Sequence, residues 1–175
     1  MVIDIYDIEL FKAVLTAAAI EDVRFYLKGV LFTKGGFVVG TDGHRLVKVK
    51  CANYEGEDVI LNPGKKVPPK ACFIEIDTES LLVRYLSSTR EEISLGRAEK
   101  IDHKYPDYAR AIPELSKEAG PSVYSFNPAL IADIQKAGKF KGFKFNVTGD
   151  EKPIRFTPYK LEDEKFIGVM MPMRL

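Results

Sequence analysis

Two runs with the same order of elements, a strand, a helix and three strands, lie at the two ends of this 175-residue chain and constrain its fold most strongly. In the first run, VIDIY alternates as a short strand does, and Ile8, Phe11 and Leu15 then follow at helical spacing. Three further segments follow, separated by a KGG turn and a DG turn, and this pattern predicts a three-stranded meander. These three segments are VRFYLKGVLFT, FVVGT and RLVKVK.

The second run occupies residues 121–175. SVYSF predicts a strand, and NPALIADIQKAG predicts a helix with Asn127 as N-cap, Pro128 at its first position and Gly138 at its end. The strands that complete the run are GFKFNV, PIRFTP and FIGVMMPM. The two ends therefore share an architecture without sharing a sequence.

The middle of the chain, from Asp58 to about Arg110, is nearly all strand. PGKKVPPKA interrupts it, and its adjacent prolines and glycine argue against a helix there. The prolines and charges of KYPDYARAIPELSKEAGPS indicate an ordered connector with a boundary near Gly120. The strands of this middle part are DVILN, CFIEID, LLVRYL and EISLG. The whole pattern predicts an α+β fold.

Composition excludes several classes of function. Lys and Arg total 26 against 25 Asp and Glu, so any contact with nucleic acid must come from a local arrangement of charge. Two cysteines are too few for a disulfide framework or a thiolate-rich metal site, and a reducing compartment is expected. The N-terminus has no signal-peptide pattern and no apolar run reaches the length of a membrane span, so we expect a cytoplasmic protein.

The stretch GTDGHRL places His44 two residues from Asp42, which raises the question of catalysis. A general base needs a nucleophile or a polarising group within reach, and no Ser or Cys motif accompanies His44. His103 is the only other histidine, so no metal site or other cofactor site is expected. The glycines precede strands and not a helix, which excludes a phosphate-binding loop. From the residues alone, the stretch is a hairpin turn in which Gly43 takes a positive φ, and we expect no enzyme.

The apolar C-terminus VMMPMRL is expected to be tied down, because exposed methionines at a chain end would reduce solubility. Methionine also suits a surface that accepts several different side chains. This gives a weak indication of a docking groove.

Three separated stretches, VRFYLKGVLF with GTDGHRL, KYPDYARAIP and VMMPMRL, together resemble the bacterial β sliding clamp, the β subunit of DNA polymerase III. The resemblance implies the DNA-clamp fold, in which β-α-β-β-β modules place antiparallel sheets outside and helices on the inner face. It also implies a non-catalytic processivity factor for DNA replication. Such a factor encircles duplex DNA without sequence preference and binds DNA polymerase and clamp-loader-type proteins.

In that family the three stretches form a hydrophobic pocket for short linear peptides. Ala111 stands where a larger aliphatic residue is usual, so one wall of the pocket is expected to be more open. Carried over position by position, the resemblance implies a pocket made of Leu27, Thr41, Gly43, His44, Arg45, Leu46, Pro106, Arg110, Val169, Met170, Met171, Pro172, Met173, Arg174 and Leu175.

One lysine on the polar stripe of the first expected helix and three around the end of the second are candidates for contact with DNA phosphates. They are Lys12, Lys136, Lys139 and Lys141. The alternative, that they are solvated surface lysines, is equally open.

The chain departs from the family in length and in its middle module. A clamp protomer has three domains of two modules each, whereas this shortened clamp-like chain joins residues 1–115, which resemble the second domain, to residues 121–175, which resemble the final half of the third. PGKKVPPKA replaces the helix of the middle module. We favour a homo-oligomeric ring, and a head-to-tail tetramer as its leading size. A ring contains about twelve modules, and about four chains of this length would supply them. Two alternatives remain. The two end modules could pair with each other, and a different number of subunits would then close the ring; or the chain could form no ring and sequester clamp-binding peptides.

Overall fold

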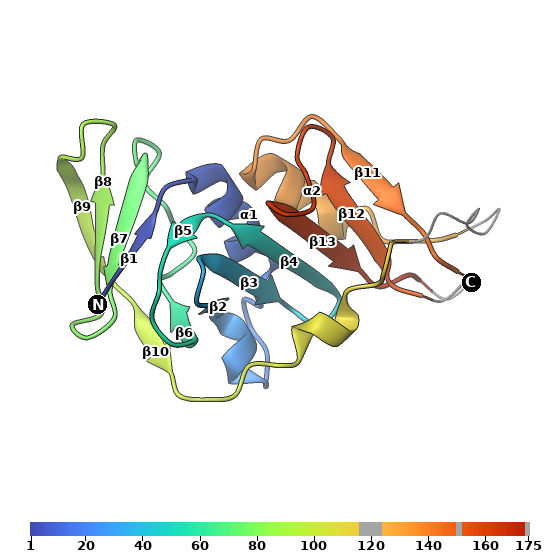
Figure 1. The fold of residues 1–175 in the computed structure, drawn as a ribbon, viewed down its shortest axis with the longest axis horizontal. Coiled ribbons are helices and arrows are strands. Elements are labelled where there is room, and N and C mark those ends of the chain that lie inside the picture. The colour runs from blue at the N-terminus through green and yellow to red at the C-terminus, as the bar shows by residue number, and fades with distance from the viewer. Residues whose placement is uncertain (116–123, 150–151, 174–175) are drawn as a thin grey trace.

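The computed structural model describes residues 1–115, 124–149 and 152–173, and it has two antiparallel sheets and two α-helices (Figure 1). We call the five-stranded sheet, of order β5-β1-β7-β8-β9, the short sheet. Its strands are β1 (Val2–Ile5), β5 (Ala52–Asn53), β7 (Phe73–Asp77), β8 (Leu82–Leu86) and β9 (Glu92–Arg97).

We call the eight-stranded sheet, of order β10-β6-β2-β3-β4-β13-β12-β11, the long sheet. The first four strands in this order lie on one side of β4, and the strands of the second run lie on the other. Its strands are β2 (Val30–Phe32), β3 (Phe37–Thr41), β4 (Arg45–Lys50), β6 (Val59–Asn62), β10 (Glu99–Ile101), β11 (Phe143–Asn146), β12 (Ile154–Pro158) and β13 (Phe166–Met170). The antiparallel sheets and the helices confirm the expected α+β class.

Strands are exchanged between the first run and the middle of the chain. β1 begins the first run but pairs with β7 in the short sheet, whereas β6 belongs to the middle part and pairs with β2 in the long sheet. The second run joins the same long sheet, because β13 pairs with β4 from Phe166↔Val49 to Met170↔Arg45. The boundary expected near Gly120 lies outside the described residues, so the division into two domains stays a prediction.

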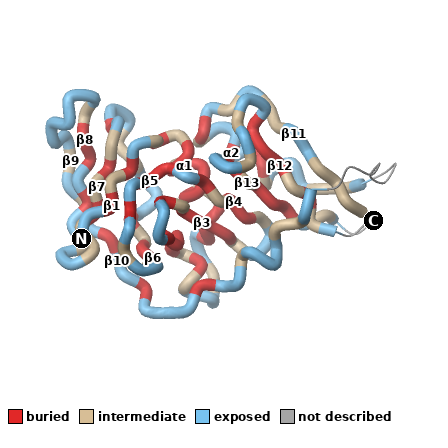
Figure 2. Tube along the Cα trace, in the orientation of Figure 1, coloured by how far each residue is buried: buried red, intermediate tan, exposed pale blue. Residues whose placement is uncertain are grey.

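The two helices, α1 (Ile8–Ala17) and α2 (Ala129–Ala137), contact each other beside the sheets. Asp7 caps α1 by accepting the Leu10 N–H at 3.1 Å. The main core lies between the helices and the two sheets, and buried residues run through α1, β3, β4 and β13, whereas β9 is mostly exposed (Figure 2). Neither helix of the described chain has the length and apolar character needed to cross a membrane.

The expected first strand of the meander is partly wrong. Phe25–Lys28 forms a 3-10 helix, η1, and only Val30–Phe32 is a strand. The alternation in VRFYLKG does not face a core, because Val23 is 98% exposed while Leu27 is buried. The Leu27 carbonyl accepts the Ala19 N–H at 2.9 Å, so the segment turns the chain from α1 back to β2.

Two details at α2 also differ from expectation. SVYSF was expected to be a strand, but no strand is assigned to the part of it that the structure describes, and the rings of Tyr124 and Phe126 stack there instead. The helix begins at Ala129, and Pro128 occupies its N-cap position. Asn127 still caps from one residue further out, because its side-chain oxygen accepts the Ala129 N–H at 3.0 Å. Residues 63–71 contain no helix, as their prolines predict.

Candidate functional site

The outer face of the long sheet, opposite the helices, carries a second and smaller apolar cluster. Alternation along β4 puts Val47 in the main core and its neighbour Leu46 in this second cluster. Leu46 lies directly across from Val169 in the β4–β13 pairing, and Tyr105 covers the same face. The seam between the first run and the second run is therefore apolar on its outer side.

A cavity of about 150 Å³ opens on this seam. Three segments that are distant in the sequence form its walls: the turn between β3 and β4, the connector after β10, and the end of β13. The lining residues are Thr41, Gly43, His44, Arg45, Leu46, Pro106, Asp107, Tyr108, Ala111, Val169 and Met171. The structure thus brings together the three stretches that carried the family resemblance.

The turn at 41–45 is held by its own short polar side chains. The Asp42 carboxylate accepts the backbone N–H groups of His44 and Arg45, each at 2.9 Å. The Thr41 hydroxyl donates to the Arg45 carbonyl at 2.7 Å and accepts the Gly43 N–H at 3.1 Å. Asp42 therefore fixes the backbone of the turn, and the structure gives it no contact with the His44 ring that would suit general-base chemistry.

Gly43 has φ +89°, a conformation that favours glycine, and Arg24 lies against it. A Cβ at this position would lie 2.9 Å from an Arg24 Nη atom. Arg24 also donates to the Asp42 carbonyl at 3.3 Å and forms an ion pair with Asp22 at 2.8 Å. Hydrogen bonds from Arg24 hold the pKa of the Asp22 carboxyl at about 2. Arg24, in the segment that follows α1, therefore stabilises the turn.

Arg45 lines the cavity, but the polar atoms of its side chain are hydrogen-bonded within the chain. Its Nη atoms donate to the carbonyls of Thr16 and Leu130, both at 2.8 Å, and its Nε donates to Asp42 at 3.0 Å. Thr16 belongs to α1 and Leu130 to α2. The guanidinium thus ties the two helices to β4.

The connector forms the second wall. The Tyr105 hydroxyl donates to the Val39 carbonyl at 3.2 Å, and burial raises the pKa of this phenol. The Tyr108 ring lies 5.7 Å from the Lys48 ammonium, which is 4.4 Å from the Phe37 ring. Burial raises the pKa of Tyr108 and lowers that of Lys48. These contacts hold the connector against the sheet.

The C-terminal segment forms the third wall. The Met171 N–H donates to the His44 carbonyl at 2.9 Å, which joins this segment to the turn, and its side chain is 45% exposed. Met170 is fully buried in the main core, and Met173 is exposed and donates its N–H to Ser125. Pro172 lies between the two exposed methionines and is half-buried. The predicted pocket residues Arg174 and Leu175 lie outside the described residues.

Five described residues that were expected in the pocket do not line the cavity: Leu27, Arg110, Met170, Pro172 and Met173. Leu27 is the buried residue of η1, and Arg110 points to solvent, 87% exposed, with an ion pair to Asp107 at 2.9 Å. Conversely, Asp107 and Tyr108 line the cavity and were not singled out. Their position directly after Pro106 in the connector was the available signal.

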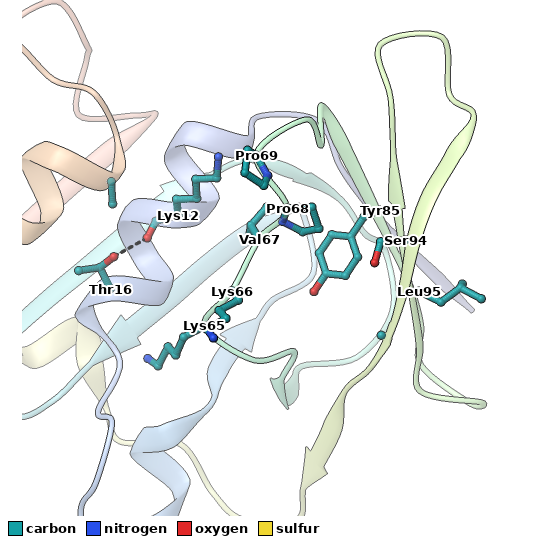
Figure 3. Close-up of a pocket in the computed structure, with 12 residues that line it drawn as sticks. Lys12, Thr16, Lys65, Lys66, Val67, Pro68, Pro69, Tyr85, Ser94 and Leu95 are labelled. Atoms are coloured by element: carbon teal, nitrogen blue, oxygen red, sulfur yellow. Dashed lines mark hydrogen bonds between the residues drawn. The ribbon is translucent and has the colours of Figure 1, made fainter.

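The helix side carries the lysines. Lys12 borders a hollow of about 750 Å³ together with Lys65, Lys66 and Tyr85 (Figure 3). Lys65 was not predicted; its ammonium donates to the carbonyls of Leu15 and Ala18, at 2.6 and 2.8 Å, at the end of α1. Desolvation, and then the charge of Arg45, lower the pKa of Lys65 to about 8.

The other predicted lysines lie around the end of α2. Lys136 is in its last turn, and Lys139 forms an ion pair with Glu9 at 2.8 Å, so part of its charge is already balanced. Lys141 lines a separate hollow of about 350 Å³ with Lys139. Among the described residues, no cluster of three or more His, Cys, Asp or Glu side chains is arranged to hold a metal ion.

Comparison with known proteins points to one family. No protein-family model matches the chain. The chain is 29% identical over 177 residues to the Beta sliding clamp of Proteus mirabilis, covering 91% of this chain and 47% of that protein. It is 27% identical to the Beta sliding clamp of Vibrio cholerae, covering 83% and 42%. The chain thus spans about half the length of the curated relatives it matches.

Solved structures give the same result for the fold. The DNA polymerase III β chain of Streptococcus pneumoniae matches with a TM-score of 0.70 at 19% identity, over 95% of this chain and 62% of that chain. The sliding clamp of Bacillus subtilis matches with a TM-score of 0.68 at 14% identity, over 100% and 64%. The chain is therefore similar to the bacterial β sliding clamps, in sequence over most of its own length and in fold, as its three motifs predicted.

Proposed function

We propose that this protein is a sliding clamp: a non-catalytic processivity factor that encircles duplex DNA as a homo-oligomeric ring and docks linear peptides of a polymerase and other partners. The relatives named Beta sliding clamp support the class of function. The observation that carries peptide docking is the convergence of residues 41–46, 106–111 and 169–171 on one apolar cavity.

The cavity suits a short apolar anchor. Leu46, Tyr108 and Val169 supply apolar wall, and a fully buried aliphatic or aromatic anchor contributes roughly 1.5–3 kcal/mol. Because only a few anchors fit such a small site, we expect binding of about −8 kcal/mol, a micromolar affinity that lets partners exchange.

DNA contact is assigned to the helix side, where Lys12 and Lys136 stand on α1 and α2 and Lys66 adds charge beside α1. Such contacts reach phosphates, so binding should weaken steeply as salt rises. A ring of copies would place this side around the duplex, with four copies the favoured number.

Retention on DNA tests the clamp function. The protein is assembled on a nicked circular plasmid, and the bound fraction is measured by gel filtration before and after the plasmid is linearised. A topological clamp stays on the circle and is lost from the linear form. Equal retention on both forms, or binding to neither while a clamp-binding peptide still docks, would identify an interaction module without a ring.

A further inference from the structure

The two longer of the four edge strands, β9 and β11, lie on opposite sides of the molecule (Figure 1). β9 ends the short sheet and has six residues, and β11 ends the long sheet and has four. The other two edges are shorter, since β5 has two residues and β10 has three. An unprotected long edge is a template for pairing with another chain.

The β9 edge is hollow on its helix side. Ser94 lies opposite Tyr85 and Gly96 opposite Val83, so the small residues of β9 share the face of two buried residues of β8. This face forms one wall of the 750 Å³ hollow, whose other walls include Val67 and Pro68 (Figure 3). Residues 63–71 stand in place of the helix that the family's middle module would carry and contain no helix, so the hollow stays open in the described chain.

At the β11 edge, the face that corresponds to the hollow face of β9 carries aromatic rings. Phe143 and Phe145 lie 5.3 and 6.4 Å from the Phe156 ring of the main core, measured between ring centroids. Phe126 continues the cluster 5.8 Å from Phe145, and Tyr124 stacks on Phe126. Phe145 is 41% exposed and Tyr124 is 44% exposed. A row of aromatic rings therefore ends in solvent at this edge.

We propose that β9 of one copy pairs with β11 of the next copy, so that the exposed rings of Phe145 and Tyr124 enter the hollow above Ser94 and Gly96. The partner is a second copy of this chain, because the two edges complement each other in shape: small residues and a hollow on one, large rings on the other. The contact is head-to-tail, so an open assembly keeps one free β9 edge and one free β11 edge, at its two ends, until a ring closes.

Charge supports the same pairing. Glu91 and Glu92 are exposed at the start of β9, and Lys141 and Lys144 are exposed at β11. None of the four has an ion pair within the described chain. Opposite charges at the two edges would favour β9 against β11 over two copies of the same edge.

This interface rests on the ring in the proposed function, and complementary edge variants test it. Ser94→Lys places a charge in the hollow and blocks only β9, whereas Phe145→Lys removes a ring and blocks only β11. Val23→Lys, at an exposed loop position, is the matched control. Sedimentation velocity gives the masses, and circular dichroism with a thermal scan shows that each variant is folded.

Wild type and Val23→Lys should sediment as multimers, and each edge variant alone should have the mass of one chain. An equal mixture of the two edge variants should form a dimer and nothing larger, because only one productive pair of edges remains. If a variant does not fold, the milder charge reversals Glu92→Lys and Lys144→Glu take its place, each weakening assembly and the mixture restoring it.

Two results would overturn the interface. Edge variants that assemble like wild type, or a mixture that forms no dimer, would reject these edges while leaving the ring itself standing. A wild-type protein with the mass of one chain at the highest soluble concentration would reject both the edges and the ring. Peptide docking, measured on the same samples, should be unchanged by either edge variant, so a failure there is a separate result.

Discussion

The two faces of the long sheet use the same strands for different purposes. On the helix side, Val47 and its neighbours are sealed under α1 and α2, and Arg45 ties both helices to β4. On the outer side, Leu46 and Val169 belong to a smaller cluster to which the connector contributes Tyr105 and Tyr108, and a small apolar cavity remains. We infer that the helix side contributes most of the stability, and the proposed docking site lies on the other face. Substitutions on the two faces should therefore separate stability from binding.

Arg45→Ala should give the largest effect. It removes hydrogen bonds to Thr16, Leu130 and Asp42 from a side chain that is 11% exposed. We expect a loss of about 3 kcal/mol in the free energy of unfolding, since a largely buried carboxylate and two carbonyls lose a charged partner. Urea unfolding measures it, with the exposed Arg110→Ala as control. An equal, small effect for both variants would contradict the helix-tying role.

Gly43→Ala should be next, at about 1–2 kcal/mol of unfolding free energy, because the residue has a positive φ and Arg24 fills the space of a Cβ. Gly35→Ala is the matched control: Gly35 has φ +86° with nothing within 4 Å of its Cβ position, so it reports backbone strain alone. The difference between the two measures the Arg24 brace. If Gly35→Ala costs as much, the brace has no energetic role.

Met171→Ala should weaken peptide docking about tenfold, or about 1.4 kcal/mol, and leave the unfolding free energy nearly unchanged. Its side chain lines the cavity and is half exposed. Fluorescence anisotropy with a labelled peptide carrying leucine and phenylalanine anchors measures the affinity, and an anchor-to-alanine peptide shows that binding is specific.

Met173→Ala is the control for this variant, because Met173 is exposed but does not line the cavity. Its affinity should stay close to that of wild type. A loss as large as that of Met171→Ala would mean that the docking surface continues along the C-terminal segment.

Lys65→Met should have the smallest effect, about 1 kcal/mol of unfolding free energy, through loss of the two hydrogen bonds at the end of α1. Lys66→Met, the adjacent exposed lysine, is the control for the loss of charge. A thermal or urea scan in which the two variants behave alike would show that the Lys65 ammonium does not cap the helix.

Local patterns predicted much of the fold. The two helices, the β strands of the middle part and the missing helix at 63–71 follow from periodicity and from proline. The segment Phe25–Lys28 was mistaken for a strand because its alternation imitates one, while the contact that decides its shape, Leu27 with Ala19, joins it back to the end of α1.

The site was harder to predict where its contacts are distant in the sequence. Gly43 and Met171 could be placed at the cavity because their motifs are distinctive. The orientation of Arg45 depends on Thr16 and Leu130, which lie 29 and 85 residues away, so no local pattern reports it. The complementarity of β9 and β11 likewise becomes visible only after the sheets are assembled.

The most direct test of the central claim is hydrogen–deuterium exchange with and without the anchor-bearing peptide, read segment by segment. We expect the peptide to slow exchange in residues 41–46, 106–111 and 169–171 together and to leave exchange in α1 and β9 unchanged. Protection that misses these segments, or that falls on the helix side, would contradict the assignment of the outer cavity as the docking site.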